Sequence, residues 1–156
     1  MTLPVRNGSL RSRSEMHNDN TLKIGFFGMN CSSARTATLV SERWLASWPD
    51  CLKLARLADE AGVDFLLPIG RWKGYGGATD YQGTTLETVT WATALLAVTK
   101  RITVFGTVHA PIFNPVVAAK EMVTADHVGE GQLRAEHRGR LERGRVRHVW
   151  RRAARA

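Results

Sequence analysis

Short apolar segments alternate with longer amphipathic segments along the first 130 residues. The apolar segments have the length and composition of buried strands and are LKIGFFGM (22–29), FLLPIG (65–70) and ITVFGTV (102–108). Each is followed by a segment with helical character, at 49–62, 84–100 and 115–129. This order predicts three parallel strand–helix units joined by right-handed crossovers.

The expected helix starts carry recognisable capping residues. Pro49 suits the first position of the first helix. Thr84 and Glu87 have the spacing of a capping box, which would start the second helix. Asn114 as the N-cap and Pro115 as the first helical residue start the third.

Two α/β architectures fit this order of elements, an open doubly wound sheet and the first part of a (β/α)₈ barrel. The first strand is followed by neither G-x-G-x-x-G nor G-x-x-x-x-G-K-[ST], so no nucleotide-binding fingerprint supports the open sheet. The pattern therefore favours an incomplete barrel. Residues 1–20 are polar and without periodicity, and we expect them to form a disordered extension.

Composition narrows the class further. With 44% hydrophobic and 23% charged residues, the 156-residue chain is typical of one soluble domain. It has no apolar stretch of membrane-spanning length and no secretory signal, which predicts a cytoplasmic protein without a membrane partner. Cys31 and Cys51 have no disulfide or metal spacing and are expected to be reduced, and the five histidines suggest no metal site.

The net charge of +8 belongs almost entirely to the C-terminal tail. Residues 131–156 contain nine arginines and two glutamates, whereas the other 130 residues have 13 basic and 12 acidic side chains. Clustered arginines can bind nucleic acid with a steep salt dependence. Apart from Trp150 the tail has no aromatic residue, which argues against specific recognition of single strands.

Several segments carry a resemblance to a known family. KIGFFGMN, DFLLPIGRWKGYGG, TTLETVTWATALLAVTKRITVFGTV and PVVAAKEMVTADHVGEG, in this order, resemble the N-terminal part of the bacterial luciferase-like monooxygenases. The likeness covers residues 21–131 and is strongest to the alkanesulfonate, dimethyl sulfone and pyrimidine monooxygenase branch. It implies a (β/α)₈ barrel that uses O₂ and reduced FMN, supplied by a flavin reductase, to oxygenate a small organic substrate. Family members are often homo-oligomers, and some relatives use a deazaflavin.

Residues 132–156 depart from this family, which continues with a fourth strand of the type RFGLNIVxGW. Codons for residues 131–150 can be chosen so that reading from the second base gives Gly-Ser-Phe-Gly-Leu-Asn-Ile-Val-Val-Gly-Trp. The outer bases of each shifted codon are fixed mainly by the observed residues. We therefore predict that the tail is a frameshift product, that the chain supplies three of the eight barrel strands, and that its active site is incomplete. The alternative is a small α/β module that binds nucleic acid through its arginine tail.

Active sites of α/β barrels lie at the C-terminal ends of the strands. The resemblance implies that Gly70 and Arg71 contact the flavin after the second strand. It also implies that the backbone at Thr107 and Val108 packs against one face of the isoalloxazine. His109 is the candidate catalytic residue, because it can hydrogen-bond to a substrate or a peroxyflavin.

Three further positions are candidates for substrate contact or for a lid. Asn30 follows the first strand, while Trp72 and Tyr75 lie in a glycine-rich loop that could close over the site and exclude water. All these positions also have a purely structural interpretation as turns, strand ends or surface loop. The substrate class expected from the resemblance is a sulfone, a sulfonate or a pyrimidine-like compound.

Overall fold

The chain folds around one parallel sheet of four strands. The computed structural model describes residue 16 and residues 21–130 and 133–138. The strands are β1 (Gly25–Phe27), β2 (Phe65–Leu67), β3 (Thr103–His109) and β4 (Leu133–Arg138). They lie side by side in chain order and are all parallel.

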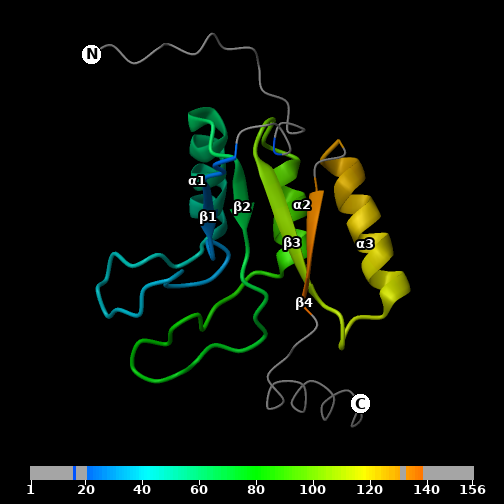
Figure 1. Cartoon of the computed structure of the whole chain (residues 1–156). Helices are drawn as coiled ribbons and strands as arrows, with labels where there is room; N and C mark the ends of the chain where they lie inside the picture. The colour runs from blue at the N-terminus through cyan, green and yellow to red at the C-terminus, as the bar shows by residue number, and fades with distance from the viewer. Residues whose placement is uncertain (1–15, 17–20, 131–132, 139–156) are drawn as a thin grey trace, which may run out of the picture.

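Three helices cover one face of this sheet (Figure 1). They are α1 (Trp48–Ala61), α2 (Thr88–Leu96) and α3 (Pro115–Val128). In a doubly wound sheet the strand order reverses and helices lie on both faces, whereas a barrel keeps chain order with all helices outside. The prediction of a partial α/β barrel is therefore confirmed.

Two of the expected helix starts are confirmed. The Ser47 hydroxyl caps α1 by accepting a hydrogen bond from the Asp50 amide at 3.3 Å, and Pro49 lies in the first turn. The Asn114 side chain caps α3 by accepting from the Val116 amide at 2.9 Å.

The expected start of α2 is wrong. The helix begins at Thr88, and Glu87 is itself the N-cap instead of the inner partner of a capping box with Thr84. The Glu87 carboxylate accepts hydrogen bonds from the amides of Val89 at 3.0 Å and Thr90 at 2.7 Å. A longer acidic side chain thus does locally what the shorter threonine was expected to do.

The described residues contain the three expected strand–helix units and a fourth strand, β4, that was not expected. β4 pairs with β3 from Val104 opposite Leu133 to His109 opposite Arg138. The backbone groups on the open side of β3 form this ladder with a partner that has only two apolar residues, Leu133 and Ala135. The disordered extension expected for residues 1–20 and the rest of the arginine tail lie outside the described residues, apart from Met16.

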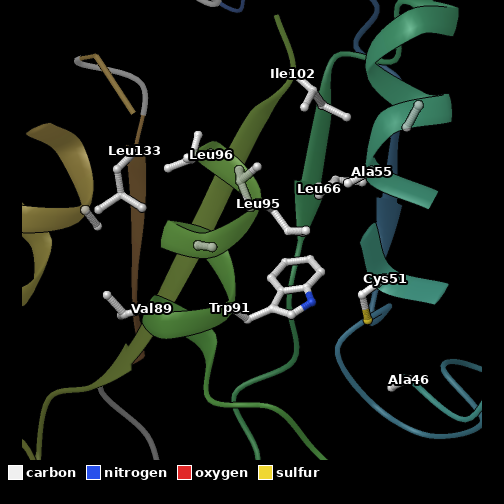
Figure 2. Close-up of a cluster of buried hydrophobic side chains, with 14 of the residues drawn as sticks. Ala46, Cys51, Ala55, Leu66, Val89, Trp91, Leu95, Leu96, Ile102 and Leu133 are labelled. Carbon is white, nitrogen blue, oxygen red and sulfur yellow. The ribbon is translucent and has the colours of Figure 1, made fainter. Parts of the chain in front are cut away.

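The core fills the space between the sheet and the helices (Figure 2). Trp91 and Leu95 of α2 point toward Leu66 of β2, and α1 contributes Cys51 and Ala55. Cys51 is a packed core thiol as expected, and Cys31 is equally buried. Burial raises the pKa of both thiols, so each stays protonated and unreactive near neutral pH. No helix in the described part of the chain is long and apolar enough to cross a membrane.

A buried carboxylate joins α1 to the start of β3. Asp59 is 7% exposed. It accepts hydrogen bonds from the amides of Lys100 at 3.0 Å, Arg101 at 2.7 Å and Ile102 at 2.7 Å. These donors precede β3 and have no strand partner there, so the carboxylate sets where the strand begins.

Replacing Asp59 with alanine should destabilise the fold strongly. The change leaves three main-chain donors without their acceptor, and hydrogen bonds to a charged group contribute about 1.5–3 kcal/mol each. We expect the free energy of unfolding to fall by about 3 kcal/mol in urea titrations followed by far-UV circular dichroism. The matched control is Glu60→Ala, at an exposed acid one residue later on α1, which should change stability by less than about 0.5 kcal/mol. Equal unfolding midpoints for the two variants would contradict this role of Asp59.

Candidate functional site

A pocket of about 190 Å³ lies at the C-terminal ends of β2 and β3. Its walls come from the loop after β2, the start of α2 and the loop after β3. The lining residues are Gly70, Arg71, Trp72, Lys73, Gly83, Thr85, Leu86, Glu87, Thr88, Thr107, His109 and Phe113. This is the edge of the sheet where α/β barrels carry their active sites.

Arg71 presents hydrogen-bond donors to which no described residue offers an acceptor. Its guanidinium lies over the ring of Tyr75, 4.2 Å from the ring centre, and Nη2 donates to the Tyr75 hydroxyl at 3.0 Å. Tyr75 is in turn stacked on Tyr81. The Nε and Nη1 atoms of Arg71 are buried and have no partner among the described residues. Buried donors without partners are costly, so they point to an acceptor supplied by a ligand or by further chain.

His109 ends β3 and is held by Trp72. The Trp72 indole N–H donates to His109 Nδ1 at 3.2 Å, and the imidazole is 5% exposed. A Cβ at Gly70 would lie 2.6 Å from His109 Cε1. The ring that requires a glycine at position 70 is therefore this imidazole, which gives Gly70 a packing role within the pocket wall.

Glu87 places a carboxylate in the pocket at the N-terminus of α2. Burial alone would raise its pKa, but hydrogen bonds from the Thr90 and Val89 amides and from threonine hydroxyls outweigh this and lower the pKa. The carboxylate already complements the positive end of the helix dipole. An anionic ligand would therefore be bound by Arg71 and Lys73, and the amides of this helix are not available to it.

The start of α2 is also tied to the end of β3. The Thr88 hydroxyl donates to the Thr107 carbonyl oxygen and accepts from the Thr107 amide at 3.3 Å. This pair fixes the backbone just before His109. Among the described residues, no group of His, Cys, Asp or Glu side chains has the arrangement of a metal site.

The structure brings five of the eight predicted site residues to the pocket wall, namely Gly70, Arg71, Trp72, Thr107 and His109. Three lie elsewhere. Tyr75 is 60% exposed and supports Arg71 from outside, while the Val108 side chain packs in the core under the helices. The Asn30 side chain is fully buried, and its amide is bonded to the main chain of Ile69 and Leu86.

Sequence reasoning missed several lining residues. Lys73 and Phe113 stand a few positions beyond the ends of β2 and β3, so extending the strand-end rule into the following loops would have found them. Glu87 was considered only as a capping residue. Its wider role follows from the short α2, which starts at the pocket.

The family follows from comparison with known proteins. The model of the luciferase-like monooxygenases matches residues 23–135, from just before β1 into β4. The match extends to residue 135, four residues beyond the end of the segment 21–131 on which the resemblance was based. The chain belongs to the luciferase-like monooxygenase family, whose members are oxidoreductases.

Individual relatives agree with this family. Pyrimidine monooxygenase RutA of Acinetobacter baylyi is 30% identical over 115 residues, which are 72% of this chain and 30% of that protein. RutA of Agrobacterium fabrum is 33% identical over 76 residues, 49% of this chain and 21% of its own length. The chain thus spans about 30% of the length of the curated relative that it matches over 115 residues.

Solved structures share the fold. Monooxygenase RslO1 of Streptomyces bottropensis superposes with a TM-score of 0.64 at 20% identity, covering 81% of this chain and 36% of that one. A riboflavin lyase, RcaE, solved with a modified FMN and riboflavin, has a TM-score of 0.61 at 23% identity, covering 75% of this chain and 29% of that one. At these identities the likenesses show the fold alone.

Replacing Glu87 with alanine should lower stability in a pH-dependent way. Loss of an N-cap costs about 1 kcal/mol at neutral pH. Because the folded pKa of Glu87 is depressed, its contribution is complete above the ordinary glutamate value and is lost as the pH falls through the folded value. Urea titrations from pH 7 down to pH 3 should show the difference between wild type and variant shrinking. The control Glu121→Ala, at an exposed acid on α3, should show no such trend, and a constant difference for Glu87→Ala would contradict the assignment.

Proposed function

We propose that the pocket is the N-terminal part of the active site of an FMN-dependent monooxygenase that oxygenates a small organic substrate. The observation that carries this proposal is Arg71, whose buried Nε and Nη1 atoms find no acceptor in the described part of the chain and lie at the edge of the sheet where barrel enzymes bind ligands. His109 lies in the same pocket wall.

The residues present fit one part of a flavin. FMN offers ring carbonyls, ring nitrogens and a phosphate, all of which accept from N–H groups, and Arg71 and Lys73 supply such donors with positive charge. The pocket volume of about 190 Å³ is below the roughly 300–1,000 Å³ of complete ligand sites. Other strand–helix units would have to form the remainder. The bound flavin would supply the oxygen chemistry.

The chain's own residues have distinct tasks in this proposal. Arg71 would bind and neutralise an anionic acceptor, and the backbone at Thr107 and Val108 would form a flat support for the ring. Trp72 would keep water out, and His109 would hydrogen-bond to the substrate. The RutA relatives favour a pyrimidine-like substrate over a sulfone or a sulfonate. Reduced FMN would come from a separate flavin reductase.

We further propose that residues 132–156 are encoded in a shifted frame. β4 occupies 133–138, and codons for these residues can be chosen so that the second reading frame gives Phe-Gly-Leu-Asn-Ile-Val at the same place. The resemblance implies that an asparagine on the fourth strand and an acid soon after it help to hold FMN. In the shifted reading this strand contains an asparagine, and the reading continues after Val-Val-Gly-Trp with Asn-Glu, whereas the present chain has neither residue at these places. This accounts for an arginine-rich tail on a nearly neutral domain and leaves the present chain without a complete site.

The DNA sequence across codons 125–160 and downstream tests this directly. We expect the second frame to stay open and to encode further strand–helix units. The protein from the repaired frame, given FMN, a flavin reductase and O₂, should oxygenate a pyrimidine such as uracil, whereas the present chain should not. If the second frame is closed, the tail is genuine and the frameshift proposal fails. Nucleic-acid binding by residues 131–156, measured as a function of salt, then becomes the function to test.

Arg71→Ala should weaken FMN binding in the repaired protein. A lost hydrogen bond between charged groups costs about 1.5–3 kcal/mol, which corresponds to a roughly 10- to 100-fold higher Kd. Quenching of flavin fluorescence on titration with protein measures the Kd. Arg56→Ala, at an exposed arginine on α1, is the matched control and should bind like wild type. Unchanged affinity in the Arg71 variant would remove the residue from the flavin site.

A further inference from the structure

We propose that Trp72 is a positioning residue that sets the tautomer of His109, so that the neutral imidazole carries its proton on Nε2. This inference rests on the proposed function in one respect: it takes His109 to be part of the active site. The arrangement itself is a property of two side chains in the present chain, one from the loop after β2 and one from the end of β3.

The direction of the hydrogen bond decides the tautomer. An indole N–H is a donor and never an acceptor. Trp72 Nε1 lies 3.2 Å from His109 Nδ1, so Nδ1 must offer a lone pair. In a neutral imidazole the other nitrogen then carries the proton. In the neutral His109 ring the N–H is therefore on Nε2.

Packing holds the indole in this position. Its ring lies 6.4 Å from the His109 ring and 6.1 Å from the Phe113 ring, tilted against both. The Phe113 amide donates to the His109 carbonyl oxygen at 3.3 Å, which keeps the loop after β3 folded back beside the imidazole. Gly70 leaves room for that imidazole, since a Cβ there would lie 3.2 Å from Nε2. The loop that carries Trp72 therefore contacts the end of β3 and holds the His109 ring in place.

The hydrogen bond between Trp72 and His109 also joins the loop after β2 to the end of β3. Trp72 is half exposed and stands on a loop that contains several glycines, so its aromatic contacts and this hydrogen bond hold it against β3. Replacing Trp72 by a residue without an N–H therefore removes the donor that favours a lone pair on Nδ1.

Nitrogen NMR on the full ¹⁵N-labelled chain tests the proposal without flavin or activity. At a pH where the imidazole is neutral, we expect the His109 Nδ1 resonance at the value of an unprotonated nitrogen and Nε2 at that of a protonated one. A scalar coupling across the hydrogen bond should connect Trp72 Nε1 with His109 Nδ1. A protonated Nδ1, or no coupling in a folded wild-type chain, would overturn the proposal.

Substitution provides the matched comparison. Trp72→Phe keeps an aromatic ring but removes the N–H, and it should move Nδ1 measurably toward the protonated value. Trp48→Phe makes the same chemical change at a half-exposed position on α1 and should leave the His109 signals unchanged. Identical His109 shifts in both variants would overturn the proposal. Because the readout is the tautomer, a protein that binds no flavin can still confirm it, and a protein that oxygenates a substrate can still refute it.

Discussion

The buried amide of Asn30 is the interaction on which the site depends. Its Nδ2 donates to the carbonyl oxygens of Ile69 at 3.0 Å and Leu86 at 2.9 Å, and its Oδ1 accepts from the Ile69 amide at 2.8 Å. One side chain after β1 therefore fixes the end of β2 and the approach to α2. Gly70, Arg71 and Trp72 follow directly after Ile69, and Glu87 follows Leu86, so two pocket walls are set by this amide. A buried amide without partners is costly, which locks the arrangement.

The sheet has two unlike faces. Leu66, Val104 and Leu133 share a register row and pack under the helices. Alternate residues point to the opposite face, where Phe65 and Phe105 meet edge to face with ring centres 5.8 Å apart and are only partly buried. In a barrel this face is the packed interior, built from layers contributed by all the strands. Four strands therefore leave an apolar surface that further strands of a barrel would cover.

Much of the fold could be predicted because the residues that start helices and form strands lie next to each other in the sequence. Asn114 with Pro115 predicted the start of α3, and Pro49 predicted the start of α1 to within one residue, because these residues lie beside the helix ends. The expected start of α2 was wrong because Thr84 and Glu87 are both possible capping residues in the sequence, and Glu87 is the one that accepts from the Val89 and Thr90 amides. The alternation of side chains along a strand could have predicted which residues at the end of β3 point into the pocket and which point toward the helices. Neighbouring residues point to opposite faces, so Thr107 and His109 reach the pocket while Val108 faces the helices. The contact of Trp72 with His109 spans 37 positions and has no local signal.

β4 is the element that side-chain patterns in the sequence did not predict. LRAEHR has only two apolar residues, Leu133 and Ala135, and the described anchor is Leu133, which is 7% exposed and lies opposite Val104. The ladder to β3 is formed by main-chain groups, and any residue but proline supplies these. The position of the strand is thus determined by the free edge of β3 and by the turn after α3, where the Asp126 side chain accepts from the Leu133 amide at 3.1 Å. Main-chain pairing can complete an edge with almost any sequence. A ligand site needs particular side chains on that strand. The presence of a fourth strand in this protein therefore does not by itself provide the ligand-binding side chains of an active site.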